Sequence, residues 1–301
     1  MIRFGRSTPR RTTAVKVAPQ PISHALPTQG AALNRSKLAG TFKHTFTASP
    51  DIWHPTLNPS GLFKSTFINE TRTKIGEERG LYVDQYVGWN PFGYSGTEKA
   101  AYIEMRPLSA EIQAQLAIPF NAAETPVVTG LLSTQRAFSD TYGYFAITAK
   151  VCKGPTGMWT ALWRTGGSWP PEDDMAEICA RDTTKHTFGV HDGDVNPDYS
   201  VSNYRHIGEN GGPFEDKSLV CGDGFHEYGV LRTQQGAVFY RDGVELRRTS
   251  ALTGNRASIP LWMVASFQAG TAAQDEWLGA LDTNMAPART YIREFAAYKL
   301  A

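Results

Sequence analysis

Four acidic residues follow a Trp-Pro-Pro sequence closely in the segment SWPPEDDMAEICAR, residues 168–181. They are Glu172, Asp173, Asp174 and Glu177. Side chains alternate between the two faces of a β-strand, so Glu172 and Asp174 share one face. Glu177 joins them only if a β-bulge inserts one extra residue between Asp174 and Glu177. With that bulge, three carboxyl groups line one surface.

Three carboxyl groups on one surface suit acid–base and nucleophilic chemistry at a glycosidic bond. Retaining glycoside hydrolysis uses two carboxyl groups about 5–5.5 Å apart, and Glu172 and Glu177 would approach that separation with Asp174 between them. Mutual repulsion would keep a proton on one of the three and raise its pKa, which suits an acid. The same cluster is also compatible with a solvated acidic loop that has no chemical role.

The elements that must position these acids are strands. From about residue 41, short aromatic and β-branched runs alternate with Gly, Pro, Asn and Asp, as in β-sandwiches. Asp242-Gly243 between two such runs predicts a hairpin, because a type I′ turn needs positive φ at both central residues. Other strands are predicted over 142–151, 259–269 and 289–298, and one short helix over 109–116. We expect an all-β, antiparallel two-sheet sandwich.

Length and composition fit this fold class. A chain of 301 residues that is 41% hydrophobic buries a large core without needing disulfides or a metal. The three cysteines, Cys152, Cys179 and Cys221, lack metal-ligand spacing and are expected as buried free thiols, with intermolecular pairing as the alternative. No run of 18 apolar residues predicts a transmembrane helix, and the basic start lacks the apolar core of a Sec signal.

Charge is unevenly distributed along the chain. Residues 1–50 carry eight Lys/Arg and no acidic residue, whereas residues 51–301 hold 22 basic and 29 acidic residues. The segment up to about residue 40 is also rich in Pro, Thr and Ala. We therefore expect a basic, extended N-terminal arm over 1–40 attached to a single domain over 41–301.

The segments around the acids resemble glycoside hydrolase family 16, the laminarinase and lichenase-like β-glucanases. The family's signature strand reads Glu-x-Asp-x-x-Glu, which Glu172, Asp174 and Glu177 match. Matching segments in family order are TGLLST (129–134), FSDTYGYFAITAKVCKGPTGMWTALW (138–163), SWPPE (168–172), GVH (189–191), FHEYGV (225–230), VFYRDGVEL (238–246) and WLGALD (277–282). The Trp-Pro-Pro-Glu form is similar to a subset associated with bacterial exopolysaccharides such as succinoglycan.

The resemblance implies a concanavalin A-like β-jelly roll that hydrolyses internal β-glucosidic bonds with retention. By the family's roles, Glu172 would be the nucleophile, Glu177 the acid/base and Asp174 the residue that tunes and holds the nucleophile. No metal or organic cofactor is expected for this reaction. A structural calcium ion is compatible with such a sandwich, but no ligand set for it can be read.

Two departures from the family pattern stand out. Asp173 replaces an apolar residue and should face the sheet-packing side, where an unpaired carboxylate costs several kcal/mol unless it is protonated or hydrogen-bonded. A local rearrangement of the strand would follow. Leu231-Arg232 replaces the family's Glu-Trp, so a packing tryptophan is missing. Both changes indicate a divergent member.

Further substrate-binding residues are expected around the acids. Trp163, Trp277, Trp159 and Trp169 could stack on sugar rings, although tryptophans in a sandwich are commonly core residues. His191 should lie on the strand beside the acids and could orient a carboxylate or bind substrate, whereas His226 is expected to be structural. Asn90 could donate to sugar hydroxyls, with a turn before Pro91 as the simpler interpretation. Arg205 and His206 are expected at the rim.

Three functional classes follow from these residues. The first is an endo-β-glycanase acting outside the cell on a bacterial exopolysaccharide or β-glucan, delivered without a Sec signal. In that class the arm would dock on a phage virion or another protein assembly. The second is a non-catalytic carbohydrate-binding or structural virion protein on the same fold. The third is nucleic-acid attachment through the basic arm, which has no accompanying motif. No membrane partner is expected.

Overall fold

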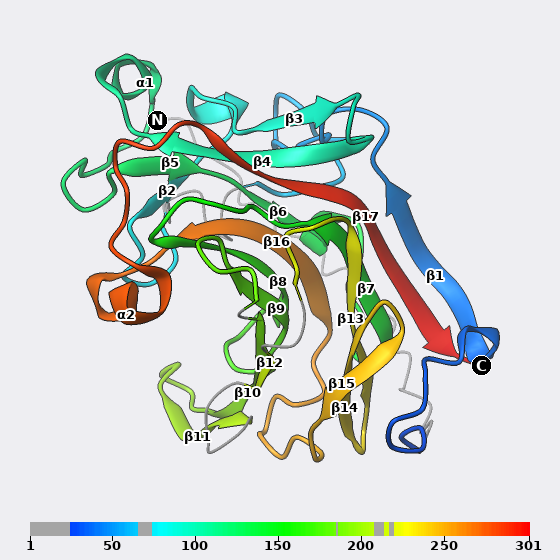
Figure 1. The fold of residues 1–301 in the computed structure, drawn as a ribbon. Helices are drawn as coiled ribbons and strands as arrows, with labels where there is room; N and C mark the ends of the chain where they lie inside the picture. Colours follow the sequence, from blue (N-terminus) through cyan, green and yellow to red (C-terminus); the bar gives the residue numbers. More distant parts are fainter. Residues whose placement is uncertain (1–24, 66–73, 185, 208–213, 217–219) are drawn as a thin grey trace, which may run out of the picture.

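A computed structural model describes residues 25–65, 74–184, 186–207, 214–216 and 220–301. Two β-sheets lie face to face, and β16 and β8 curve strongly across the molecule (Figure 1). The ten-stranded sheet has the order β15-β14-β13-β7-β17-β4-β5-β2, with β1 beside β17 and β3 beside β4. The seven-stranded sheet has the order β11-β10-β9-β8-β16-β6, with β12 beside β10.

The two sheets draw their strands from the whole described chain. The ten-stranded sheet contains β1 (Leu38–Thr45), β2 (Gly80–Tyr82), β3 (Phe92–Ser95), β4 (Ala100–Pro107), β5 (Val127–Thr129), β7 (Gly143–Lys150), β13 (His226–Thr233), β14 (Gly236–Arg241), β15 (Val244–Arg248) and β17 (Ala288–Leu300). The seven-stranded sheet contains β6 (Leu131–Ser133), β8 (Met158–Gly166), β9 (Glu172–Cys179), β10 (His186–Val195), β11 (Val201–Ile207), β12 (Phe214–Asp216) and β16 (Leu261–Ala269). The α-helices are α1 (Ala110–Gln115) and α2 (Asp275–Leu278).

The all-β sandwich predicted from the sequence is confirmed, as is the hairpin at Asp242-Gly243. Asp242 and Gly243 have φ values of 52° and 77°, as a type I′ turn requires. The predicted helix begins after Ser109, whose side chain accepts a hydrogen bond from the backbone N–H of Ile112. The second helix, α2, was not predicted, because four residues are too few to show a helical period. The sheets are antiparallel except where β2 pairs with β5.

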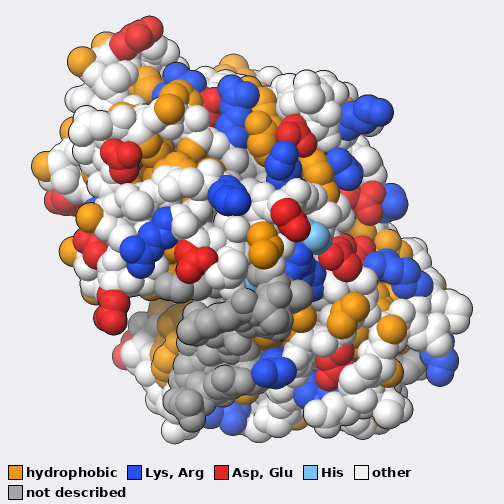
Figure 2. All heavy atoms as spheres, viewed as in Figure 1, with side chains coloured by type: hydrophobic (Ala, Val, Ile, Leu, Met, Phe, Trp, Pro, Cys, Tyr) orange, Lys and Arg blue, Asp and Glu red, His pale blue; other side chains and the backbone are white. Residues whose placement is uncertain are grey.

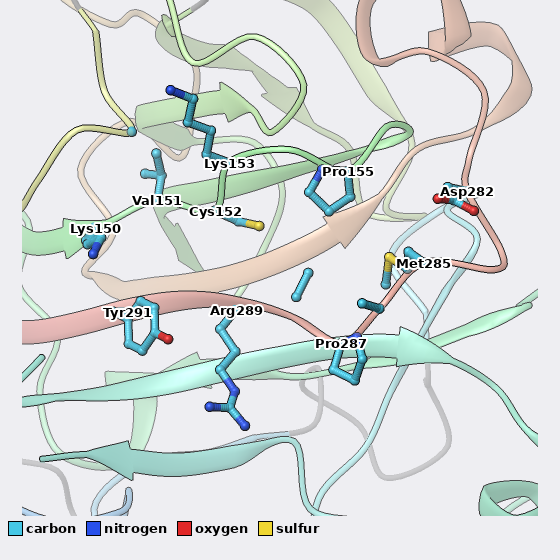
Figure 3. Close-up of a pocket in the computed structure, with 13 residues that line it drawn as sticks. Lys150, Val151, Cys152, Lys153, Pro155, Asp282, Met285, Pro287, Arg289 and Tyr291 are labelled. Carbon is cyan, nitrogen blue, oxygen red and sulfur yellow. The ribbon is translucent and has the colours of Figure 1, made fainter. Parts of the chain in front are cut away.

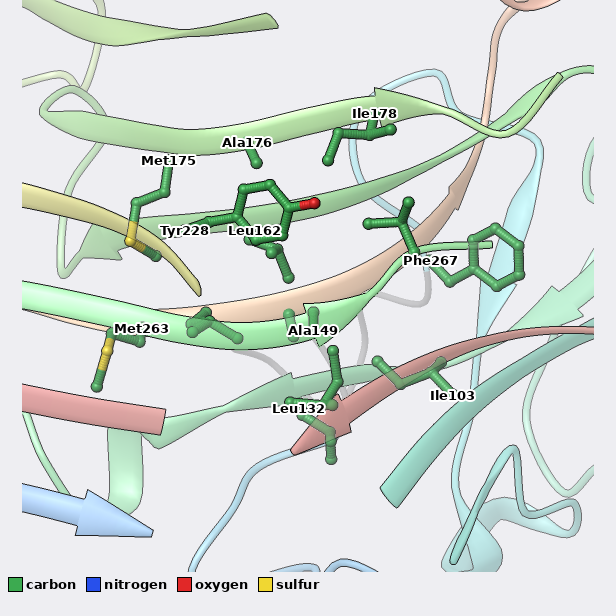
Figure 4. Packing of buried hydrophobic residues seen from close by; sticks show 14 of the residues in the cluster. Ile103, Leu132, Ala149, Leu162, Met175, Ala176, Ile178, Tyr228, Met263 and Phe267 are labelled. Atoms are coloured by element: carbon green, nitrogen blue, oxygen red, sulfur yellow. The ribbon is translucent and has the colours of Figure 1, made fainter. Parts of the chain in front are cut away.

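The core between the sheets is built by the inward side chains of both. Ile103, Ala149 and Tyr228 come from the ten-stranded sheet, and Leu162 and Met263 come from the seven-stranded sheet (Figure 4). All five are buried in one cluster. Cys152, Cys179 and Cys221 are also buried, as the sequence analysis expected, and form no disulfide with one another. None of the described helices is long and apolar enough to span a membrane.

One charged group lies inside this core. Asp173 is fully buried, and its carboxylate accepts hydrogen bonds from Arg164 at 2.7 Å and from Arg232. Asp173, whose burial without a partner would be costly, is therefore paired. Its partner Arg232 stands at the position where the family's tryptophan is missing, so the two departures from the family pattern compensate each other.

Residues 25–40, which the sequence analysis assigned to the arm, pack on the outer face of the ten-stranded sheet. Leu26, Leu33 and Leu38 lie against a buried cluster that includes Tyr144 and Tyr240. The backbone N–H of Leu33 donates to the carbonyl of Gly243 at 2.8 Å, and the Arg35 guanidinium contacts Glu227 at 2.5 Å. Because these residues cover the outer face of β7, both faces of that strand are largely buried. The alternation of its sequence predicts burial of one face only. The basic residues at 1–24 lie outside the described part of the chain.

The packing of residues 25–40 can be tested by truncating one side chain. Leu33→Ala should lower the free energy of unfolding by about 1–2 kcal/mol, because Leu33 is half-buried rather than fully buried. Urea denaturation followed by tryptophan fluorescence measures the change. Leu57→Ala is the matched control, since Leu57 is 68% exposed. Equal free energies of unfolding for the two variants would mean that residues 25–40 do not pack on the sheet in solution.

Candidate active site

The three acids of the motif reach one face of β9 through an irregularity in the strand. Opposite β8, Leu162 pairs with Ala176 and Trp163 pairs with Asp174, which leaves Met175 as the extra residue. The pairing with β10 shifts at the same place. Met175 and Ala176 both enter the core. The bulge required by the spacing Glu-x-Asp-x-x-Glu is therefore present, and Glu172, Asp174 and Glu177 line the face of the sheet away from the core.

His191 of β10 stands across from Glu172 and joins the carboxylates. Its Nε2 lies 3.0 Å from Oδ2 of Asp174 and 3.6 Å from Oε1 of Glu172. Its Nδ1 lies 2.6 Å from the hydroxyl of Tyr204. Its ring stacks on His206 of β11 with centroids 4.1 Å apart. His191 is thus fixed on three sides, and the prediction that it lies beside the acids is confirmed.

Hydrogen bonds orient the two glutamates separately. The indole Nε1–H of Trp159 donates to Oε1 of Glu177 at 3.1 Å, and the Thr187 hydroxyl lies 3.5 Å from Oε2 of the same group. Glu172 accepts a hydrogen bond from Trp169. Trp169 is 45% exposed and lies beside His191 and Tyr204. Each glutamate therefore has its own indole donor.

The electrostatics of the cluster favour retained protons. Burial, assisted by the charge of Asp174, raises the pKa of Glu177 to about 7 and raises the pKa of Glu172 well above its usual value. Burial lowers the pKa of His191, but the contact with Asp174 and the surrounding carboxylates outweigh it and bring that pKa to about 9. At neutral pH the site thus combines an imidazolium with carboxyl groups that share protons, which suits acid–base work.

Side-chain atoms of Asp174, His191 and His206 all lie within 4.8 Å of one another, a grouping that is also found in metal sites. In this group His191 faces Asp174 at 3.0 Å, and the carboxylates around it bring its pKa to about 9. Its ring also stacks on His206.

The remaining predicted residues lie in different surroundings. Trp163 is 5% exposed and donates from Nε1 to the Ser266 hydroxyl at 3.1 Å, so little of its ring is open to a ligand. Trp277 packs on Trp159 with ring centroids 5.8 Å apart. Asn90 precedes β3 in the other sheet, where its Oδ1 accepts from the backbone N–H of Phe92 at 3.0 Å, as the turn interpretation has it.

Residues expected at the rim or in a structural role are also placed. Arg205 contacts Asp192 and Thr253. His226 lies between Asp223 and Asp242, at 2.9 and 2.7 Å, as a structural residue would. His206, by contrast, reaches the cluster through its stacking on His191.

Tyr204 and Thr187 are site residues that sequence reasoning missed. Tyr204 is 46% exposed beside Trp169 and touches His191. In the sequence, Tyr204 stands two residues before His206, so the two side chains share one face of a strand. That spacing points to the site only once β11 is known to pair with β10. Gly189 leaves the room for this arrangement, because a Cβ there would lie 3.0 Å from Nε2 of His206.

A separate hollow of about 610 Å³ lies away from the acids, at the ends of β7 and β17 (Figure 3). Lys150 and Arg289 line it, but their charged groups contact Glu98 and Glu104 at 2.7 and 2.8 Å. Glu172, Asp174 and Glu177 do not contribute to its lining.

Comparisons with known proteins fit this geometry. The family model of glycosyl hydrolases family 16 matches residues 105–286, more than half of the chain. The chain is 30% identical over 251 residues to the endo-1,3-1,4-beta-glycanase ExsH of Rhizobium meliloti (strain 1021), covering 80% of this chain and 48% of that relative. It is 29% identical over 186 residues to the endo-1,3-1,4-beta-glycanase EglC of the same organism, covering 61% and 35%. The chain thus spans less than half the length of these two relatives.

Solved structures show the same fold. The catalytic domain of an endo-1,3-beta-glucanase (laminarinase) from Thermotoga petrophila RKU-1 is 20% identical with a TM-score of 0.60, covering 87% of this chain and 98% of that one. LamAcat from Zobellia galactanivorans is 15% identical with a TM-score of 0.64, covering 88% and 99%. The fold is thus a β-jelly-roll sandwich, and the chain belongs to glycosyl hydrolase family 16.

The ion pair at the centre of the site can be tested by titration. Asp174→Asn should lower the pKa of His191 from about 9 by at least about one unit, because the neutral amide no longer favours the imidazolium. Imidazole titration by NMR measures it. Asp223→Asn is the control, since Asp223 faces His226 instead. A His191 pKa that is unchanged by Asp174→Asn would contradict the described pairing.

Proposed function

We propose that this protein is a retaining endo-β-glycanase that cleaves β-1,3 or β-1,4 glucosidic bonds. The observation that carries the proposal is the bulged strand that brings Glu172, Asp174 and Glu177 to one face, with the pKa of Glu177 held near 7. A carboxyl group with that pKa is half protonated at neutral pH and can act as both acid and base. The family membership of the chain supports the same reaction class.

The roles we propose follow from the surroundings of each acid. Glu172 attacks the anomeric carbon in its ionised form. Burial and Asp174 raise its pKa well above the usual value, and the protonated His191 at 3.6 Å and the Trp169 indole oppose that shift. Glu177 protonates the leaving oxygen and then activates the water that releases the product. Asp174 holds His191 beside Glu172 through their 3.0 Å contact. Two successive displacements at the anomeric carbon retain its configuration.

We propose a glucan or a glucose-containing bacterial exopolysaccharide as the substrate. Both Rhizobium relatives carry the name endo-1,3-1,4-beta-glycanase, and one of them aligns with 80% of this chain. The exposed rings of Trp169 and Tyr204 beside Glu172 offer a platform for the C–H face of a sugar. The proposed reaction takes place outside the cell, where such polymers are found.

The competing functions have less support. Asp173 and the divergence from the family pattern favour a non-catalytic sandwich, but Asp173 is paired with Arg164 and Arg232. Lys/Arg and Asp/Glu side chains are interspersed over the face in Figure 2. Nucleic-acid attachment through the basic arm stays a prediction, since the basic residues at 1–24 lie outside the described part of the chain. Docking of the arm on a phage virion or another assembly stays a prediction, since residues 1–24 lie outside the described part of the chain.

The proposed chemistry is tested by removing each carboxylate in turn. Glu172→Gln and Glu177→Gln should each lower the release of reducing ends from mixed-linkage β-glucan, laminarin or succinoglycan by at least about a hundredfold. Glu111→Gln in α1 is the control and should keep full activity. NMR of the first product should show the β-anomer. Binding without any release from these polymers by the unmodified protein would refute the proposal.

The pH dependence gives a second test. The pKa of Glu177 near 7 means that its acid form is present below that pH and is lost above it. We therefore expect kcat/KM on a glucan to fall as the pH rises through about 7. With a dinitrophenyl β-glycoside, whose leaving group needs no proton, this fall should disappear. A fall that persists with the activated substrate would assign it to another group.

A further inference from the structure

The buried group Arg164–Asp173–Arg232 lies directly behind the acids. Asp173 stands between Glu172 and Asp174 on β9, so its side chain points to the opposite face of the same sheet. It contacts Arg164 of the neighbouring strand β8 at 2.7 Å and Arg232 of β13 in the other sheet. The strand that presents Glu172 and Asp174 is thus fastened to both sheets of the sandwich at one residue.

Both arginines are held in place by further contacts. Arg164 donates from Nη2 to the carbonyl of Asp140 at 2.7 Å, and its guanidinium lies 3.4 Å from the ring centre of Phe145. Arg232 donates from Nη2 to the carbonyl of Ala257 at 2.8 Å. The group is therefore connected to two loops as well as three strands, which fixes the depth of Asp173 in the core.

The group has a surplus of positive charge. Two guanidinium groups face one carboxylate, so the three side chains carry a net charge of +1 at neutral pH. Burial lowers the pKa of Arg164 to about 9, which still leaves it charged in the range where the acids titrate. The side chain of Asp140 also faces Arg164, but it lies 3.6 Å from Lys299 and is partly exposed to solvent. A buried net positive charge lowers the pKa of nearby carboxyl groups, because it stabilises their ionised form.

We propose that Arg164, Asp173 and Arg232 form a positioning group that sets the protonation of the catalytic carboxyl groups from behind the strand. This proposal rests on the proposed function and deepens it. On the substrate side, Glu172, Asp174 and Glu177 face His191, His206 and Tyr204, and His191 is the one cation among those six described side chains. The buried group supplies a second positive charge from the core. The net positive charge favours the ionised forms of Glu172 and Asp174, which flank Asp173 on β9, more than that of Glu177, which lies farther along the strand.

The effect has a definite direction and size. At an effective dielectric constant of about 20, a unit charge roughly 10 Å from a carboxyl group shifts its pKa by about one unit. Removing the surplus charge should therefore raise the pKa of Glu172 and move the acid limb of kcat/KM to higher pH by about one unit. The basic limb should move less, because Glu177 lies farther along β9 from Asp173.

The decisive variant replaces the whole group. Arg164→Met, Asp173→Leu and Arg232→Met together leave no unpaired buried charge, and apolar replacement of a buried ionic triad is often tolerated. We expect this triple variant to fold with an acid limb about one unit higher. A folded variant whose two limbs coincide with those of the unmodified protein would overturn the proposal, since a purely structural group leaves the pH profile unchanged.

A second pair of variants covers the case in which the triple variant does not fold. Arg232→Gln removes the surplus charge but keeps hydrogen-bond donors, whereas Arg232→Lys keeps the charge. The acid limb should move up with Gln and stay in place with Lys, and equal limbs in the two variants would overturn the proposal. Titration of glutamate carboxyl carbons by NMR follows the same shift without turnover, so an inactive protein would contradict the proposed function while still testing this inference.

Discussion

The alternation of side chains along a β-strand is the constraint on which this site depends. Acids at positions 172 and 174 share a face, but the acid at 177 would point into the core of a regular strand. The extra residue at Met175 reverses that alternation, and both neighbouring strands shift their register there. One inserted residue thus turns an acidic segment into a group of three carboxyl groups on one surface, and it sends Met175 and Ala176 into the core.

The same alternation explains the opposite face of the strand. Asp173 must point into the sandwich, where an unpaired carboxylate would be costly. Arg164 and Arg232 supply the partners, and Arg232 does so from the other sheet. The acids on the outer face of β9 and the acid that faces the core are therefore parts of one electrostatic arrangement. It contains His191 on one side of β9 and two guanidinium groups on the other.

The rest of the site follows from strand order. Because β10 pairs with β9, His191 stands across from Glu172, and because β11 pairs with β10, His206 stands across from His191. Trp159 reaches Glu177 from β8 on the other side. Glu172 and Glu177 thus both receive contacts from neighbouring strands, while burial and the charge of Asp174 raise the pKa of each.

The sequence by itself determined the all-β class, the Asp242-Gly243 turn, the short helix after Ser109 and the motif Glu172-x-Asp174-x-x-Glu177, because these depend on local spacing and local backbone preferences. It also indicated the need for a bulge. Only the tertiary structure decided which side chains meet from distant strands. The pairing of Asp173 with Arg232 joins residues 59 positions apart, and the exposure of Trp169 against the burial of Trp163 depends on which strands flank each ring. Residues 25–40 looked like an arm because they lack strand periodicity, and only the outer face of the sheet shows what their leucines cover.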